Sequence, residues 1–72
     1  MKGVIMKLKD FRKTEAFAKA NIVEYYNQDR QEILLPTTQV KWRKLLNKEV
    51  IRCEFKTDSE KGLNIIELFI EI

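Results

Sequence analysis

The clearest pattern in this chain is an alternation of apolar and polar positions over its last third. In residues 63–72 every second side chain is aliphatic, and a spacing of two sends such side chains to one face of a strand. These aliphatic residues are Ile66, Leu68, Ile70 and Ile72. Residues 50–55 alternate in the same way, and a polar run over residues 57–62 ends in Gly62, which accepts a positive φ. The pattern predicts a terminal β-hairpin.

Two helices are expected earlier in the chain. Residues 8–20 are rich in Lys, Arg, Glu and Ala and contain neither Gly nor Pro, which favours a helix. Phe17 lies off the apolar stripe that contains Phe11, so we expect a break near Thr14, and Asn21 suits a left-handed cap.

The second helix is expected over residues 39–47, with Thr37 or Thr38 as its N-cap. Its apolar stripe comprises Trp42, Leu45 and Leu46.

A second hairpin is expected between the two helices. Residues 22–26 and 32–35 are rich in β-branched, aromatic and aliphatic side chains, and residues 27–31 form a polar turn between them. Pro36 ends the second strand or marks a sheet edge.

The predicted fold class is α+β, in the order α-β-β-α-β-β. A single domain over residues 1–72 would form a four-stranded, mainly antiparallel sheet with two short helices on one face. The expected core comprises Phe11, Val23, Tyr25 or Tyr26, Leu34, Trp42, Leu45, Phe55, Leu68 and Ile70. Residues 1–5 are an N-terminal extension before Met6, or Val4, Ile5 and Met6 form a short strand or a flap.

Composition narrows the chemistry. The chain has 72 residues, no His and one Cys, so neither a Cys/His zinc site nor an intrachain disulfide can form. A domain of this size buries about 60% of its unfolded surface, which leaves little room for a deep cavity. No apolar run of about 18 residues is present, and the absence of disulfides fits a reducing compartment. We therefore expect a soluble cytoplasmic protein with no membrane segment, metal or cofactor.

Enzymatic activity is not expected. Without His the usual general base is missing. Glu67 and Glu71 are four apart on a strand, about 13 Å, which is too far for a catalytic pair, and their expected partners are Arg52 and Lys56 across the hairpin. Cys53 alternates with inward-facing residues, so we expect a buried, inert thiol and no catalytic residue.

The net charge of +3 is unevenly distributed, because both predicted helices are basic and the terminal hairpin is acidic. Basic residues around Trp42 could bind nucleic acid, although its place on the apolar stripe favours a core position for the ring. Ordinary solvation of exposed helix faces is the alternative. The nucleic-acid-binding candidates are Arg12, Lys13, Lys41, Arg43 and Lys44.

The second face of the sheet offers another candidate surface. Phe69 alternates with two glutamates on the face opposite the aliphatic residues, so it would be exposed if the helices cover one face only. Cover by residues 4–6 or by a second copy of the chain is the alternative. The protein-binding candidates are Tyr25, Tyr26, Ile65, Glu67, Phe69 and Glu71.

Residues 6–72 begin with MKLKDF, continue through a short helix ending in LLNKEV and finish on IEI. This layout resembles small uncharacterised proteins of phages and prophages of low-GC Gram-positive bacteria. The chain departs from their pattern in its longer basic first segment and in residues 1–5. The resemblance implies a bacterial host cytoplasm as the setting and supplies no binding residues.

The expected function is a non-enzymatic protein-interaction module that acts through its open sheet face or an edge strand, with self-association as one form. The alternative is a nucleic-acid-binding accessory protein that uses its basic helix residues.

Overall fold

The computed structural model describes residues 6–72, which form three short helices and a four-stranded sheet. In chain order the elements are β1 (Met6–Lys7), α1 (Leu8–Phe11), α2 (Glu15–Lys19), β2 (Ile22–Asn27), α3 (Gln39–Leu46), β3 (Glu49–Asp58) and β4 (Leu63–Ile70). The interpretations offered for residues 1–5 lie outside the described residues, and Met6 is the first residue of β1.

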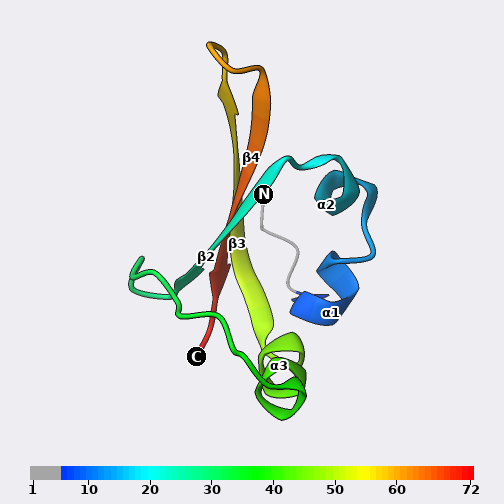
Figure 1. Ribbon diagram of the computed structural model, residues 1–72. Helices are drawn as coiled ribbons and strands as arrows, with labels where there is room; N and C mark the ends of the chain where they lie inside the picture. The colour runs from blue at the N-terminus through cyan, green and yellow to red at the C-terminus, as the bar shows by residue number, and fades with distance from the viewer. Residues whose placement is uncertain (1–5) are drawn as a thin grey trace.

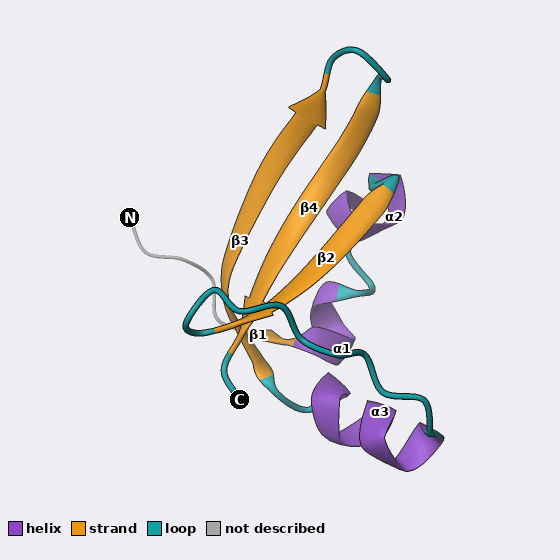
Figure 2. Cartoon of the chain, turned by 60° about the vertical axis from the view of Figure 1, so that its left-hand side comes forward, coloured by secondary structure: helices purple, strands orange, loops and turns teal. Residues whose placement is uncertain are grey.

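The predicted α+β class is confirmed, with a difference in topology. The strands lie in the order β1-β3-β4-β2, and β3 pairs antiparallel with both β1 and β4. β2 pairs with β4 in parallel, so the sheet is mixed (Figure 2). All three helices lie on one side of the sheet (Figure 1), and the opposite side is called the open face below.

The predicted break in the first helical segment is confirmed at Thr14. Its Oγ1 donates to the carbonyl of Phe11 (2.7 Å) and accepts from the N–H of Phe17 (3.3 Å), so one hydroxyl closes α1 and caps α2. The left-handed cap predicted at Asn21 is wrong, because within residues 6–72 only Arg30 and Gly62 have positive φ. The side chain of Asn21 instead accepts a hydrogen bond from the N–H of Asn64 (2.8 Å) and ties β2 to β4.

The hairpin predicted between residues 22–26 and 32–35 is wrong. Only one bridge, Tyr26 to Glu32, joins these segments, and β2 lies beside β4 instead. The physical reason is that β4 carries apolar side chains on both faces, which is typical of a central strand that needs a neighbour on each side. Leu34, predicted to be buried, is 94% exposed.

Helix α3 forms as predicted, with Thr38 as its N-cap. Thr38 Oγ1 accepts from the N–H of Lys41 at 3.3 Å. Leu45 is buried, and Trp42 and Leu46 are half-buried against the core, so this apolar stripe faces inward.

The core lies between the helices and the sheet. It consists of Leu8, Phe11, Leu45, Val50, Ile66, Leu68 and Ile70. Phe55, predicted to be in this core, is 65% exposed, whereas its partner Ile66 on the same face of β4 is buried. The helices therefore cover β4 at this level and leave the outer strand β3 uncovered, while the tip of the β3–β4 ribbon extends beyond them (Figure 1). Ile72 is also exposed, since it lies beyond the end of β4.

Two backbone features decide which side chains of the ribbon face which way. The β3–β4 register shifts between Val50 and Arg52, so Ile51 is an extra residue at a bulge. Gly62 has a φ of 67° and donates to the carbonyl of Asp58 (2.7 Å), which confirms the predicted turn.

Among residues 6–72 no helix combines the length and apolar character needed to cross a bilayer.

Candidate interaction surface

Phe69, expected at the centre of an exposed patch, is only 4% exposed. The parallel register places Tyr26 directly beside it, and the two rings stack with centroids 5.4 Å apart. The guanidinium groups of Arg30 and Arg52 lie 5.3 and 5.8 Å from the Phe69 ring centroid. Phe69 is therefore covered by neighbouring side chains of the same chain, and the prediction that it is exposed is wrong.

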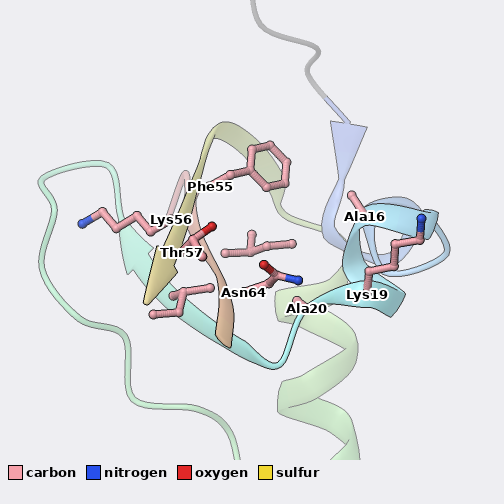
Figure 3. A pocket seen from close by; sticks show the side chains of 9 residues that line it. Ala16, Lys19, Ala20, Phe55, Lys56, Thr57 and Asn64 are labelled. Carbon is pink, nitrogen blue, oxygen red and sulfur yellow. The ribbon is translucent and has the colours of Figure 1, made fainter. Parts of the chain in front are cut away.

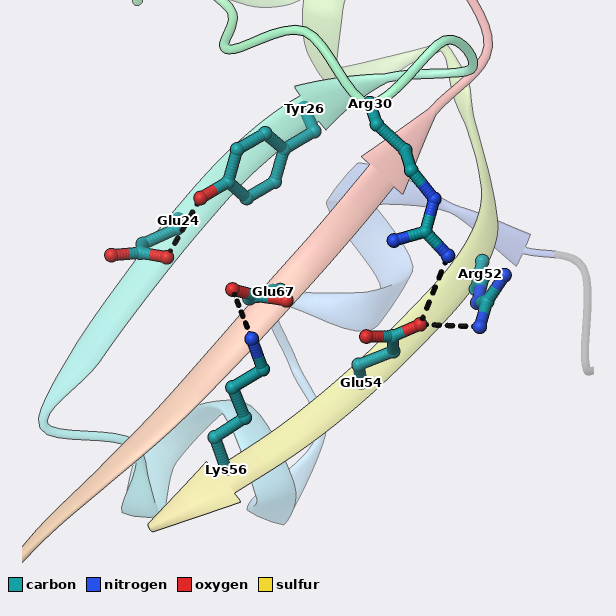
Figure 4. A network of polar contacts seen from close by, with 7 residues as sticks. All are labelled: Glu24, Tyr26, Arg30, Arg52, Glu54, Lys56 and Glu67. Carbon is teal, nitrogen blue, oxygen red and sulfur yellow. Dashed lines mark hydrogen bonds and ion pairs between the residues drawn. The ribbon is translucent and has the colours of Figure 1, made fainter. Parts of the chain in front are cut away.

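A row of three glutamates crosses the open face beside this cluster, one from each of β2, β4 and β3 (Figure 4). Tyr26 Oη donates to Glu24 (2.9 Å), Lys56 Nζ lies 3.0 Å from Glu67, and Glu54 pairs with Arg52 and with Arg30 (3.7 Å). The predicted pair of Lys56 with Glu67 is confirmed. Arg52 pairs within its own strand, with Glu54, and not with a glutamate of β4 as predicted.

These contacts change the acid–base behaviour of two side chains. The hydrogen bond to Glu24, followed by partial burial and the nearby carboxylates, raises the pKa of Tyr26 to about 12. The hydrogen bond to Glu67 raises the pKa of Lys56. Each hydrogen bond stabilises the protonated form of its donor, Tyr26 or Lys56. The open face is therefore held together by hydrogen bonds and ion pairs.

The other predicted protein-binding residues are spread over both sides of the sheet. Tyr25 points toward the helices and packs against the core, and burial raises its pKa. Ile65 and Glu67 are half-buried on the open face, and Glu71 is exposed beyond the end of β4. The six residues therefore do not form one surface.

The sequence predicts binding at the open sheet face or at an edge strand, but it does not indicate which residues form that edge, and the outer edge of β3 is one such edge. The carbonyl of Asp58 points toward the β3–β4 turn, where it accepts a hydrogen bond from Gly62. Because successive residues of a strand point their backbone groups to opposite sides, the N–H and C=O groups of Cys53, Phe55 and Thr57 point away from β4. Within residues 6–72, β1 pairs only with Glu49 and Val50. The backbone groups of Cys53, Phe55 and Thr57 are called the β3 edge below.

Two open apolar hollows flank Phe55 on the helix side of this edge. One, of about 200 Å³, lies between α2 and the ribbon, with Ala16 and Ala20 on one side and Phe55 and Thr57 on the other (Figure 3). The other, of about 330 Å³, is lined by Met6, Phe11 and Cys53 among others. An exposed aromatic ring between two apolar hollows is a surface suited to contact with another protein.

The free thiol of Cys53 is half-buried beside this edge. Burial, followed by the charge of Glu54, raises the pKa of Cys53, which disfavours the reactive thiolate. Among residues 6–72 no three His, Cys, Asp or Glu side chains are close enough together to hold a metal ion.

The predicted nucleic-acid-binding residues divide into two groups. Arg12 and Arg43 line one surface pocket together with Trp42, and the Arg12 guanidinium lies 5.5 Å from the Trp42 ring centroid. Lys41 and Lys44 line a different pocket, beside Leu34 and Ile72 among others. Lys13 is exposed in the turn between α1 and α2.

Comparison with known proteins gives no match to a protein-family model, a curated protein or a solved structure.

Proposed function

We propose that this chain is a non-enzymatic protein-interaction module that binds its partner by adding a strand to the β3 edge. One observation carries the proposal: the outward backbone groups of Cys53, Phe55 and Thr57 lie next to an exposed Phe55 ring. In strand addition the backbone hydrogen bonds provide affinity, and pockets for alternate side chains provide specificity. The two hollows beside Phe55 are such pockets.

The edge is a better binding surface than the open face. Phe69, the expected apolar anchor of the open face, is already covered by Tyr26 and two arginines. A partner at the open face would have to displace charged groups that have partners in this chain, which carries a desolvation cost. A partner at the β3 edge gains backbone hydrogen bonds and covers Phe55.

The setting that we propose is the cytoplasm of a bacterial host, with a phage or prophage origin. This part of the proposal rests on the layout of residues 6–72.

An affinity capture from lysate of the encoding organism tests the proposal, with three versions of the chain as bait. Thr57→Pro removes an outward N–H that has no role in the β3–β4 ladder, so the fold should persist while strand addition fails. Leu34→Glu is the matched control, because it changes a 94% exposed side chain away from the edge. We expect a protein retained by wild type and Leu34→Glu and lost with Thr57→Pro.

The folded state of each bait is checked by circular dichroism. Capture that is equally strong with Thr57→Pro, or cross-links that map outside β3, would contradict binding at the β3 edge.

A second candidate function is nucleic-acid binding by the helix layer, which comprises α1, α2, α3 and the residues that flank them on the side of the sheet opposite the open face. It is favoured by the pocket that gathers Arg12, Trp42 and Arg43, and by α3, which carries three basic residues and no acidic one. Since Arg12 already lies over the Trp42 ring, the basic groups would contact phosphates while the ring stays in place.

Salt-titrated binding to a single-stranded oligonucleotide tests this candidate. Loss of one phosphate contact in Arg43→Ala should lower the slope of log K against log salt by about one unit. Lys61→Ala, in the β3–β4 turn, is the control and should leave the slope unchanged. An affinity that does not respond to salt would remove this candidate.

A further inference from the structure

The side chains of β3 carry charges of alternating sign on the open face. In order along the strand these residues are Arg52, Glu54, Lys56 and Asp58. On the helix side the intervening residues, Cys53, Phe55 and Thr57, are uncharged. Charged residues often protect an exposed edge strand against pairing. Here, however, the alternating charges make β3 complementary to a second copy of β3 that runs antiparallel to it.

The antiparallel registers available to two copies of β3 can be compared directly. If the pairing centres on Phe55, Glu54 lies opposite Lys56 of the second copy and Arg52 lies opposite its Asp58, so every charged pair is attractive. A centre on Glu54 or on Lys56 places like charges opposite each other. A centre on Cys53 or Thr57 shortens the paired stretch, because β1 occupies β3 at Val50 and the turn begins after Asp58.

The backbone favours the same centre. With Phe55 on the two-fold axis, the outward groups of Phe55 face those of its copy, and those of Cys53 face those of Thr57. Such a pairing forms about six hydrogen bonds between the chains. The two Phe55 rings then lie side by side on the helix side of the joined sheet, next to the hollows that flank each ring.

We infer that the partner at the β3 edge is a second copy of this chain, paired antiparallel about Phe55 into a two-fold symmetric dimer with one continuous sheet. The inference rests on the proposed function and names its partner. The interface is isologous, so each favourable charged pair occurs twice. The side chains of Arg52 and Lys56 are 57% and 56% exposed, which leaves them accessible to the second copy while they contact Glu54 and Glu67.

Disulfide trapping tests the register. Within one chain residues 53 and 57 are about 13 Å apart along the strand, too far for a disulfide, whereas across the inferred dimer they lie opposite each other at about 5.5 Å between Cα atoms. Thr57→Cys, with Cys53 retained, should therefore oxidise to a covalent dimer. The control Thr57→Cys with Cys53→Ala should form no covalent dimer, because the two copies of position 57 are about 13 Å apart along the strands in this register.

Charge reversal tests the complementarity without a covalent bond. Glu54→Lys and Lys56→Glu each place like charges in two symmetric pairs, so each should weaken the dimer about tenfold or more. An equimolar mixture of the two single variants restores attraction at both pairs and should form a heterodimer. The readout is the mass by light scattering, from 8.6 kDa to twice that value, over a series of concentrations up to about 1 mM.

Each outcome decides between the proposals. Suppose that the wild-type chain stays monomeric, that Thr57→Cys is not trapped, and that lysate capture yields another protein sensitive to Thr57→Pro. This result overturns the dimer and leaves the proposed function in place. A dimer that ignores both charge reversals and Thr57→Pro overturns both. A third outcome is measured by amide exchange at residues 53, 55 and 57. If these amides stay protected at high dilution and lose that protection when residues 1–5 are deleted, the edge is occupied by the chain's own N-terminus and the inference is overturned.

Discussion

At the scale of single residues, two phenylalanines of the same ribbon have opposite environments. Phe69 is 4% exposed beneath Tyr26, Arg30 and Arg52, and Phe55 is 65% exposed. Phe55 lies between Glu54 and Lys56 in the sequence, and Phe69 lies two residues from Glu67 and two from Glu71. Alternation therefore identifies the face of the strand that a ring occupies, and the neighbouring elements decide whether that ring is covered.

This contrast predicts a large difference in stability between two matched variants. Phe69→Ala removes a fully packed ring and should cost about 3–5 kcal/mol of unfolding free energy, comparable to the whole stability of a domain this small. Phe55→Ala should change the unfolding free energy of the monomer by about 0.5 kcal/mol or less. Urea denaturation followed by circular dichroism, at low concentration, measures both. Equal losses would show that the Phe69 cluster does not form.

The hydrogen bond from Tyr26 to Glu24 predicts a dependence of stability on alkaline pH. The pKa of Tyr26 is raised from 10.0 to about 12 in the folded chain. Its stabilising contribution is therefore complete below pH 10 and is lost as the pH rises from 10 through about 12. The free energy of unfolding of wild type should fall across this interval relative to that of Tyr26→Phe.

Ultraviolet titration of the phenolate provides an independent measurement. In Glu24→Gln the carboxylate charge is removed, so the transition assigned to Tyr26 should move to lower pH, while that of Tyr25 stays in place. An unchanged titration in Glu24→Gln would contradict the assigned cause.

At the scale of elements, the helices depend on their caps because they are short. α2 has five residues and α3 has eight, which is too few for either to be stable alone in water. Thr14 and Thr38 each satisfy a backbone N–H at a helix start. These caps fix where the helices begin and hence which side chains reach the sheet.

Thr38→Ala should therefore lower the unfolding free energy by about 1 kcal/mol, since the N–H of Lys41 loses its acceptor. Thr37→Ala is the matched control, because Thr37 is the exposed neighbour that precedes the cap, and it should have a much smaller effect. Urea denaturation of the two variants provides the comparison. A larger loss in Thr37→Ala would mean that α3 begins one residue earlier.

At the scale of the whole molecule, the charges separate by layer. The helix layer presents most of the basic side chains. On the open face Glu54 pairs with Arg30 and Arg52, Glu67 pairs with Lys56, and Glu24 accepts a hydrogen bond from Tyr26. The two proposed functions therefore use different parts of the molecule, the β3 edge and the helix layer. A variant that removes one function is expected to leave the other intact, so the two can be tested separately.

The local sequence was sufficient to predict the terminal hairpin, its turn at Gly62 and the break at Thr14. It also limited the N-cap of α3 to Thr37 or Thr38, of which Thr38 caps the helix. Each depends on residues close together in the chain, where side-chain spacing and backbone preference act directly. The sequence also indicated that Ile66, Leu68 and Ile70 share a buried face.

Only the tertiary structure decided which strands are neighbours. The parallel pairing of β2 with β4 joins segments about 43 residues apart, and no local pattern specifies such a partner. That pairing places Tyr26 over Phe69, and among residues 6–72 no strand pairs with the outer edge of β3 beyond Val50. The prediction that Phe69 is exposed was wrong for this reason. Exposure and edge position depend on contacts between distant segments, whereas periodicity indicates only the direction in which a side chain points.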